Sequence, residues 1–441
     1  MKLALVGAGQ RGMIYATYAY QSKRAEIVAV VEPDEAKRKA AADLFQLSAE
    51  MQFVTVEEFY QLGKAADAII IASMDRDHYG QAMAALDLGY QILLEKPISP
   101  DPRESLEIKE KANRLKLNVI VCHVLRYTNF FSAIKSIIDR NELGKVVSIQ
   151  HNENIGNYHM AHSFVRGNWR RSSLSSPLIM QKSCHDMDIL TWLAGSEAKR
   201  ISSFGSLTYF KEENAPENSS DRCHTCKAAR KCRFDARKAY LPAAGSWPAT
   251  ILSRDQSRAG ILKAIETGPY GRCVYRCDND VCDNQVALIE FKNGVTVSFN
   301  LSGFTNKMCR TIKIMCENGE IRGDDSRNVI EITRFASNAV NQYEQRVIHP
   351  GIVEGGHGGG DIGLMNDFMD MLEGKGGFYK SSVNQSVESH IMAYAAEQSR
   401  IRGVIIDMDE LKENLMQEDS SNNKSVVKVD EIEKGSSDFP K

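Results

Sequence analysis

The chain has 441 residues, of which 43% are hydrophobic, and its 55 Lys and Arg residues nearly balance its 57 Asp and Glu residues. This is the composition of a globular protein, and the length exceeds the roughly 250–300 residues that one hydrophobic core serves, so we expect two domains. A net charge of −2 excludes a strongly basic surface for nucleic acid or a membrane, and no run approaches the roughly 20 apolar residues of a membrane span. We therefore expect a small neutral ligand and, because the N-terminus runs into a glycine turn rather than a signal peptide, a cytoplasmic location.

Short β-branched runs alternate with amphipathic segments through the first part of the chain. Alternation of this kind is typical of a parallel sheet covered by helices. The predicted strands are residues 3–6, 27–31, 68–71, 92–94 and 119–121. We assign residues 1–123 to this first domain.

A glycine-rich turn joins the first strand to the first helix. It has the G-x-G-x-x-G spacing, and its residues are Gly7, Ala8, Gly9, Gln10, Arg11 and Gly12. Glycines at this spacing permit a tight turn, close approach of a pyrophosphate and close packing of the helix. Glu32 ends the second strand about 20 residues further on, where a carboxylate accepts hydrogen bonds from ribose hydroxyls. The pattern predicts a dinucleotide site that includes Glu32.

The identity of the dinucleotide also follows from Glu32. A carboxylate at this position repels a 2′-phosphate, which favours NAD over NADP. Lys37 and Arg38 are near enough in the sequence to keep NADP open.

The charged sequence Glu95-Lys96-Pro97 follows the apolar run 91–94. It is expected at the carboxyl edge of the sheet, where open α/β sheets bind ligands. Next, a helix is expected with Asp101 as N-cap, Pro102 at its first position and Glu104 as capping-box partner, which would fix the loop that carries Lys96. The alternative is that Glu95 and Lys96 form a solvated surface pair.

Longer strands are predicted after the first domain. They are residues 146–154, 201–209, 285–291, 295–301 and 311–316. They indicate a second domain, residues 124–410, with a large, open and mostly antiparallel sheet, one face of which should close the active-site cleft. Because an open sheet usually buries one face against a partner, we expect a homodimer or homotetramer.

A segment rich in polar and aromatic residues spans residues 157–170. Planar hydrogen-bonding groups and aromatic faces bind carbohydrates, so it is interpreted as substrate-binding material, the alternative being an exposed loop. The glycine-rich loop 354–361 permits close approach of a ligand in the same way. The substrate candidates in these two segments are Tyr158, His162, Arg166, Asn168, Trp169 and His357.

A further polar group lies in the segment 181–193. On a helix, Lys182, His185 and Asp188 share one face and can converge on one ligand. A stripe of this kind beside apolar residues requires a polar cavity or solvent. The alternative for His185 is a satisfied structural histidine.

These features together resemble the Gfo/Idh/MocA oxidoreductases, which act mostly on sugars and cyclitols. The glycine motif, Glu95-Lys96-Pro97 and the helix with His185 carry the resemblance, which spans residues 1 to about 410. It implies an α/β fold with an N-terminal Rossmann domain and a C-terminal α+β domain. It also implies that Lys96 is catalytic, near the reacting hydroxyl and the nicotinamide, and that the peptide before Pro97 shapes the cofactor site. His185, with Lys182 beside it, completes the catalytic set.

The resemblance extends to other positions and fails at one. Ser73 and His78, in the loop after strand 68–71, are included with the cofactor site together with Glu95 and Pro97, and Arg126 is included as a substrate candidate. His78 and Arg126 are expected to be mainly architectural. Many family members have an Asp four residues before the histidine, whereas this chain has Gln181, which cannot ionise and leaves the general base open.

Cysteines cluster in a polar insertion, residues 211–240. Cys223, Cys226 and Cys232 have the spacing C-x2-C-x5-C, and Cys277 or Cys273 offers a fourth thiol. Four thiolates of this kind bind structural zinc, which would stabilise the fold of a segment with few apolar residues. An iron–sulfur cluster or free surface thiols are the alternatives.

We expect an NAD-dependent oxidoreductase that oxidises a secondary hydroxyl of a sugar, sugar derivative or cyclitol. One alternative is an NAD-dependent glycoside hydrolase that works by transient oxidation, elimination and re-reduction. Another is a non-catalytic dinucleotide-dependent binding protein. The polar tail, residues 417–441, is expected to be disordered.

Overall fold

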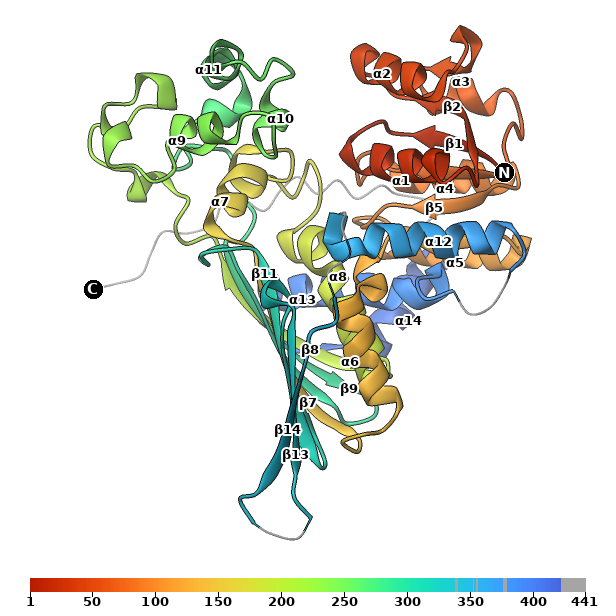
Figure 1. Ribbon diagram of the computed structural model, residues 1–441, viewed down its shortest axis with the longest axis vertical. Coiled ribbons are helices and arrows are strands. Elements are labelled where there is room, and N and C mark those ends of the chain that lie inside the picture. The colour runs from red at the N-terminus through yellow and green to blue at the C-terminus, as the bar shows by residue number, and fades with distance from the viewer. Residues whose placement is uncertain (338–339, 352, 354–355, 376–378, 422–441) are drawn as a thin grey trace.

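The computed structural model of the protein describes residues 1–337, 340–351, 353, 356–375 and 379–421. Figure 1 shows three parts: a helix-covered sheet formed by the N-terminal residues, a long twisted sheet below it, and a lobe of short helices beside the first sheet. None of the helices in these ranges is both long and apolar enough to cross a membrane.

The N-terminal sheet has six parallel strands in the order β3-β2-β1-β4-β5-β6. The strands are β1 (Lys2–Val6), β2 (Glu26–Val31), β3 (Gln52–Phe53), β4 (Ala68–Ile71), β5 (Gln91–Leu94) and β6 (Val119–Val121). The five predicted strands are present, and β3 was missed because two residues are too short for periodicity to register. The strand order reverses between β1 and β4, so their carboxyl ends frame the point where such sheets bind ligands.

Helices cover both faces of this sheet. They are α1 (Gln10–Gln21), α2 (Glu35–Phe45), α3 (Val56–Tyr60), α4 (His78–Asp87) and α5 (Pro102–Leu115). Helix α5 begins as predicted, with the Asp101 side chain accepting the backbone N–H of Arg103 at 2.9 Å. The expected capping box is wrong: the backbone N–H of Asp101 donates to Ser99 Oγ, and Glu104 accepts a hydrogen bond from the same Ser99 hydroxyl.

The C-terminal part of the chain returns to the first domain. Helix α12 (Gly360–Leu372) buries Leu364, Met365 and Phe368 in the same core as Leu3 and Leu5 of β1. Helices α13 (Val383–Arg402) and α14 (Met408–Ser421) follow. Residues 417–421, predicted to be disordered, continue α14, and the rest of the predicted tail lies outside the described residues.

The large sheet has nine strands in the order β14-β13-β12-β11-β7-β10-β9-β8-β15, and all neighbours are antiparallel except β7 and β10. The strands are β7 (Val146–Asn154), β8 (Ala198–Ser206), β9 (Asn284–Phe291), β10 (Thr296–Ser302), β11 (Cys309–Cys316), β12 (Gly319–Asp324), β13 (Val329–Phe335), β14 (Tyr343–Ile348) and β15 (Ile406–Asp407). The predicted mostly antiparallel sheet is confirmed. Strand β8 starts three residues earlier than predicted, and β12 to β15 were missed.

Helices pack on one face of the large sheet. Figure 1 shows α6 (Asn129–Asp139), α8 (Leu178–Ala194) and α13 on the same side of it. The side chains on the opposite face include the exposed apolar residues Phe204, Val286 and Leu288.

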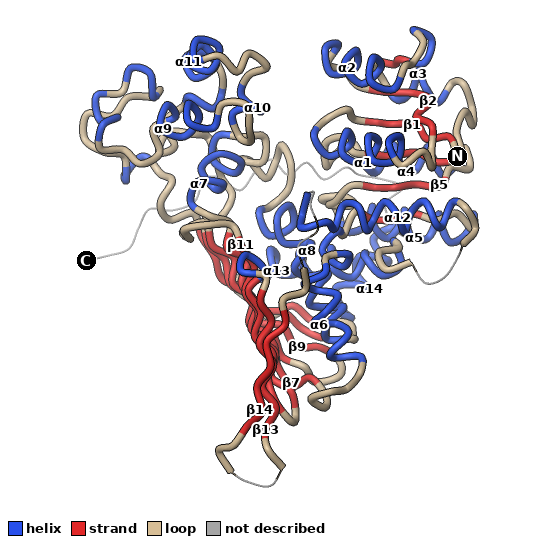
Figure 2. Tube along the Cα trace, in the orientation of Figure 1, coloured by secondary structure: helices blue, strands red, loops and turns tan. Residues whose placement is uncertain are grey.

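The lobe of short helices is an insertion between β8 and β9. Its helices are α9 (Ala236–Tyr240), α10 (Ala249–Leu252) and α11 (Arg258–Thr267), and most of its chain is loop (Figure 2). The insertion extends well beyond the predicted residues 211–240. A short helix α7 (Asn157–His159) and a π-helical turn (Met160–Arg166) follow β7 and contact this lobe through Tyr158 and Arg166.

Candidate active site

The glycine turn between β1 and α1 leaves room for a ligand at one position. A side chain at Gly7 or Gly12 would collide with backbone: its Cβ would lie 2.5 Å from the Ala72 oxygen or 2.0 Å from the Gly7 oxygen, respectively. By contrast, a Cβ at Gly9 would meet nothing within 4 Å, and Gly9 precedes α1 without a capping side chain. The free N–H groups of a helix N-terminus beside open space fit a pyrophosphate.

Glu32 lies at the end of β2 as predicted and faces the glycine turn. Its Oε2 accepts the backbone N–H of Ala8 at 2.8 Å and its Oε1 accepts that of Asp34 at 3.0 Å. Arg38, one of the two residues that left NADP open, donates to the backbone oxygen of Glu32 at 2.6 Å. The carboxylate is thus oriented at the strand end, where ribose hydroxyls would be bound.

Two of the predicted cofactor-site residues, Ser73 and His78, make contacts within the protein instead of facing the ligand site. Ser73 Oγ donates to Gln81 at 2.7 Å, and buried His78 contacts the backbone oxygen of Pro97 through Nδ1 at 2.8 Å. His78 therefore holds the peptide next to Lys96.

Arg11 ties the glycine turn to the C-terminal part of the chain. Its guanidinium pairs with Glu95 at 2.9 Å and with Asp361 at 2.6 Å, and His357 lies 3.2 Å from the same Asp361 carboxylate. Burial alone would raise the pKa of Glu95, but the positive charges of Arg11 and Lys96 outweigh it and hold that pKa below its usual value. Glu95 is therefore an ionised anchor for Arg11 rather than a surface carboxylate.

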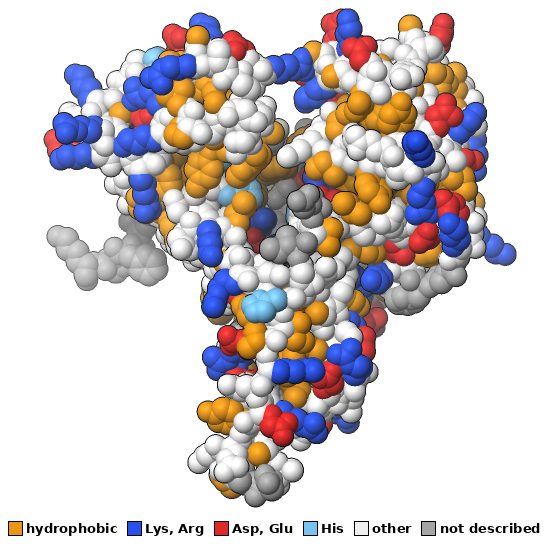
Figure 3. Space-filling model, in the orientation of Figure 1, with side chains coloured by type: hydrophobic (Ala, Val, Ile, Leu, Met, Phe, Trp, Pro, Cys, Tyr) orange, Lys and Arg blue, Asp and Glu red, His pale blue; other side chains and the backbone are white. Residues whose placement is uncertain are grey.

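A cleft of about 720 Å³ lies between the glycine turn and the large sheet. Figure 3 shows the surface hollowed here, between the N-terminal domain and the insertion. Its lining includes many of the polar side chains considered above and several that the sequence did not single out. Those with hydrogen-bonding, charged or tryptophan side chains include Gln10, Arg11, Lys96, Glu153, His159, Trp169, Gln181, Lys182, Trp247, Arg310 and His357.

Lys96 is one of the residues that line this cleft. Its Nζ donates to the backbone oxygen of Gln181 at 3.0 Å. Within the described part of the chain, no carboxylate oxygen lies within 4.0 Å of this ammonium, because Glu95 is turned toward Arg11. An ammonium group without an ion-pair partner can exchange a proton with a bound hydroxyl at low electrostatic cost.

His185 is a residue of α8 and lies close to Lys96. It is 6% exposed, and its ring centre is 5.6 Å from that of His123 and 6.2 Å from that of His357. Burial, reinforced by the charge of Lys96, lowers the pKa of His185 well below its usual value, so the ring is neutral at pH 7. Its Nδ1 is buried without a hydrogen-bond partner.

Lys182 belongs to a buried ionic network that sequence reasoning missed. It pairs with Glu153 of β7 at 3.2 Å, and Arg310 of β11 pairs with Glu153 at 2.7 Å and with Asp186 at 2.8 Å. The signal was the alternation along β7, where the inward positions change from Ile149 to a polar residue at Glu153.

The stripe predicted on the α8 helix does not converge on one ligand. Asp188 accepts two hydrogen bonds from Arg126 at 2.7 Å, inside the protein. This pairing also removes Arg126, a substrate candidate, from the cleft, because its guanidinium is held inside the protein by the buried carboxylate of Asp188. Lys182 lines the cleft, whereas His185 is absent from its lining and lies next to the cleft residue His357.

The structure divides the other substrate candidates into two groups. Trp169 and His357 line the cleft, while exposed Asn168 is absent from its lining. Buried His162 stacks on Tyr270, and Tyr158 donates to the backbone oxygen of Ala239 at 3.2 Å. Arg166 is buried and donates to backbone oxygens of the insertion. Tyr158, His162 and Arg166 were predicted as site residues because local composition does not reveal which side of a segment faces a cavity.

Trp247 is a cleft residue that the sequence did not indicate. It comes from the insertion, and its ring lies 5.3 Å from that of His159 and 5.4 Å from that of His162. The insertion thus forms one wall of the cleft. The part of the loop 354–361 that precedes Gly356 lies outside the described residues.

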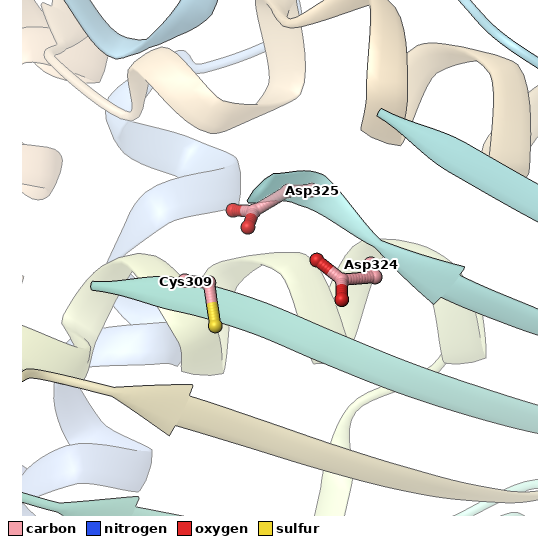
Figure 4. A group of neighbouring side chains, drawn as sticks. All are labelled: Cys309, Asp324 and Asp325. Carbon is pink, nitrogen blue, oxygen red and sulfur yellow. The ribbon is translucent and has the colours of Figure 1, made fainter. Parts of the chain in front are cut away.

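A group of potential metal ligands lies at the edge of the cleft. Within the described residues, Cys309, Asp324 and Asp325 are the one group of three or more such side chains whose ligand atoms all lie within 4.8 Å of one another (Figure 4). Asp324 accepts hydrogen bonds from Ser326 and from the backbone of Arg327, and Asp325 accepts the backbone N–H of Arg310 at 2.8 Å. These carboxylates fix the chain between β12 and β13.

The cysteines of the insertion gather around a second, small cavity. Cys223, Cys226, Cys232 and Cys273 line it, and all ten cysteines are free thiols. Cys277, which was predicted as a metal ligand, lies outside the lining and donates its thiol to the backbone oxygen of Cys273 at 3.2 Å. Cys273, the other candidate for the fourth thiol, lines the cavity instead.

A glycine turn at the switch point of a parallel sheet, facing a cleft that a second domain closes, defines a two-domain dinucleotide-binding protein. Two family models match the chain: "oxidoreductase family, NAD-binding Rossmann fold" over residues 1–123, and "oxidoreductase family, C-terminal alpha/beta domain" over residues 135–406. The chain therefore belongs to the Gfo/Idh/MocA oxidoreductase family. This confirms the predicted family, the fold class and the enzyme class, an NAD(P)-dependent dehydrogenase acting on CH–OH groups.

Individual relatives are distant. The chain is 25% identical over 312 residues to YteT of Bacillus subtilis (strain 168), covering 68% of this chain and 71% of YteT. It is 28% identical over 206 residues to an inositol 2-dehydrogenase of Corynebacterium glutamicum, covering 46% of this chain and 56% of that enzyme. The crystal structure of an oxidoreductase from Agrobacterium radiobacter in complex with NAD⁺, L-tartaric acid and magnesium has the same fold, with a TM-score of 0.67, 14% identity, and coverage of 93% of this chain and 99% of that one.

Proposed function

We propose that the protein oxidises a secondary hydroxyl of a sugar, sugar derivative or cyclitol and transfers the hydride to NAD. The observation that carries the proposal is the position of Lys96, whose ammonium lies in the cleft beside the glycine turn without an ion-pair partner among the described residues. The similarity to an inositol 2-dehydrogenase supports a polyol substrate.

Each group in the cleft has a proposed task. Lys96 exchanges the proton of the substrate hydroxyl, while the bound nicotinamide would supply the hydride acceptor. Buried, neutral His185 provides a second proton-accepting nitrogen behind Lys96. Because Gln181 cannot ionise, the side chain at that position serves binding, and its backbone oxygen orients Lys96.

Substrate recognition is proposed to combine flat apolar faces with hydrogen-bonding groups. Trp169 and Trp247 offer the faces, and Lys182, His159 and His357 offer the polar contacts. Lys182 is neutralised by Glu153, which favours an uncharged substrate over a strongly anionic one.

A spectrophotometric screen tests the proposal. Purified protein is incubated with NAD or NADP and a panel of cyclitols, free sugars and sugar phosphates, and formation of reduced cofactor is measured. We expect turnover with at least one neutral polyol and a preference for NAD, because Glu32 repels a 2′-phosphate. An absence of turnover across the panel with both cofactors would argue against a dehydrogenase.

The second candidate is an NAD-dependent glycoside hydrolase. It is favoured by His159, a cleft residue whose Nδ1 has no hydrogen-bond partner and whose pKa burial lowers well below its usual value, so that it is a neutral base. Release of the phenol from aryl glycosides in the presence of NAD, with no accumulation of NADH, would identify this reaction.

We also propose that the open face of the large sheet binds a second copy of the chain. Phe204, Val286 and Leu288 are 66%, 41% and 56% exposed on neighbouring strands. Apolar side chains gathered on a sheet face in this way are typical of an oligomer interface. Light scattering should give a dimer or tetramer, and Leu288→Lys should shift the molar mass toward the monomer.

A further inference from the structure

The insertion between β8 and β9 has a small core of its own. Its separate cluster of buried apolar residues consists of Cys223, Ala236, Tyr240, Ala249, Ile261 and Ile265. Other buried residues of the insertion, such as Phe210, Phe234 and Tyr275, pack into the main core instead. A separate cluster this small usually depends on a disulfide or a metal for a fixed structure. All the cysteines here are free thiols.

Four of these thiols surround one cavity although they come from two distant parts of the chain. Arg222 and Arg272 form an antiparallel β-bridge, and the backbone N–H of Cys273 donates to the oxygen of Asp221 at 2.7 Å. This pairing places Cys273 beside Cys223, whose loop continues to Cys226 and Cys232. The cavity that they line has a volume of about 10 Å³, the room of one water-sized sphere.

A buried cation lies against the same thiols. The side chain of Arg166 is almost fully buried, and it donates to the oxygens of Arg272 and Phe234 and to Cys223 Sγ at 3.4 Å. Among the described residues no carboxylate oxygen lies within 4.0 Å of its guanidinium. A buried guanidinium without a counter-charge is costly, and neighbouring thiolates would supply that charge.

We propose that Cys223, Cys226, Cys232 and Cys273 bind one zinc ion as a structural tetrathiolate centre. Binding releases the four thiol protons to solvent and forms four Zn–S bonds, leaving a net charge of −2 that the adjacent Arg166 offsets in part. No three of the four sulfur atoms lie within 4.8 Å of one another in the structure, so binding must draw the side chains inward. Protonated thiols attract one another only weakly, so no force in the thiol form brings the sulfur atoms to the spacing that a zinc ion imposes.

The proposed zinc centre lies near one wall of the cleft. Arg166 ends the turn that begins beside His159, and Trp247 of the insertion contacts His159 and His162. The zinc would therefore fix the wall of the cleft to which Trp247 belongs, without contact with the substrate.

Metal analysis of the purified protein tests the proposal without reference to activity. We expect about one zinc per chain by elemental analysis and native mass spectrometry, and loss of that zinc in Cys223→Ser and Cys273→Ser. Cys277→Ser is the matched control, since this neighbouring thiol lies outside the cavity, and it should retain the full zinc content. Removal of zinc from the wild-type chain by a chelator should lower its melting temperature, which keeps the test valid if the serine variants do not fold.

Three outcomes would overturn the proposal: wild-type protein without metal after growth with added zinc, iron with visible absorption in place of zinc, or zinc retained in Cys273→Ser and lost in Cys277→Ser. Because the readout is metal content, it is independent of the proposed dehydrogenase activity. Lys96→Met should carry the same zinc as the wild type.

Discussion

Lys96 is the side chain on which the proposed chemistry depends. Its Nζ has one backbone acceptor, the oxygen of Gln181, and projects into the cleft. We expect Lys96→Met to reduce kcat by a factor of about 10²–10⁴, the usual contribution of an acid–base group, while the dissociation constant for NAD changes less than about tenfold. Steady-state kinetics and a fluorescence titration with NADH measure the two quantities. Wild-type turnover in this variant would remove Lys96 from the mechanism.

Lys182 provides the matched comparison. It is a neighbouring lysine of the same cleft, but it pairs with Glu153. In Lys182→Met, Glu153 keeps its pairing with Arg310, so the network should survive. We expect KM for the polyol to rise several-fold with a smaller change in kcat, the reverse of the pattern for Lys96→Met.

At the scale of elements, the turn from β1 to α1 distinguishes glycines needed for folding from one needed for binding. A Cβ at Gly12 would collide with the Gly7 oxygen, whereas a Cβ at Gly9 would project into open space. We expect Gly12→Ala to lower the melting temperature of the cofactor-free protein and Gly9→Ala to leave it nearly unchanged. Gly9→Ala should instead weaken NAD binding by tenfold or more, because the methyl group would occupy the space assigned to the pyrophosphate.

Thermal unfolding with and without NAD separates these effects. The stabilisation by saturating NAD should be largely lost in Gly9→Ala. Unaltered NAD affinity in this variant would show that the cofactor does not approach the turn.

At the scale of the whole molecule, an ion pair between Arg254 and Asp34 joins the insertion to the first domain. Arg254 of the insertion lies 2.8 Å from Asp34, two residues beyond Glu32, and both side chains are largely exposed. An exposed pair contributes little to stability because water and salt screen it. We therefore expect Arg254→Ala to leave the melting temperature unchanged and to weaken NAD binding by no more than about fivefold, with the difference disappearing at high salt.

The control for this pair is Arg258→Ala. Arg258 begins α11 of the same insertion, and it has no carboxylate within 4.0 Å among the described residues. Equal losses of NAD affinity in both variants would indicate a general effect of charge rather than the Asp34 contact.

Buried histidines determine the pH dependence of stability. Burial lowers the pKa of His162 to about 4 and of His390 to about 3, and it lowers those of His123 and His185 well below their usual value. In the unfolded chain these groups titrate near 6.5, so their stabilising contribution is complete above that pH and is lost as the pH falls through the window between the two values. At pH 5 each costs about 2 kcal/mol.

The melting temperature should therefore fall by several degrees between pH 7.5 and pH 5, before carboxylates with a lowered pKa, such as Glu95, begin to protonate. Buried carboxyls whose pKa is raised, such as Glu388, act in the opposite direction and moderate the fall. A melting temperature that is constant over this interval would contradict the neutral, buried state of the histidines.

The sequence by itself determined the features that depend on neighbours along the chain. The alternation of strands and helices, the G-x-G-x-x-G turn, the position of Glu32 and the start of α5 at Pro102 follow from local patterns, because residues close in sequence specify periodicity, turns and caps.

Only the tertiary structure decided which polar residues face the cleft. Asp188 and Arg126 turned out to satisfy each other, whereas Glu153, Arg310 and Trp247, from β7, β11 and the insertion, line the cleft together with Lys182. A buried charge needs a partner, and which partner it finds depends on strand pairing and on the path of an insertion over long stretches of sequence. The same reason decided between the two candidates for the fourth thiol, since a β-bridge between distant residues brings Cys273, and not Cys277, to the cavity.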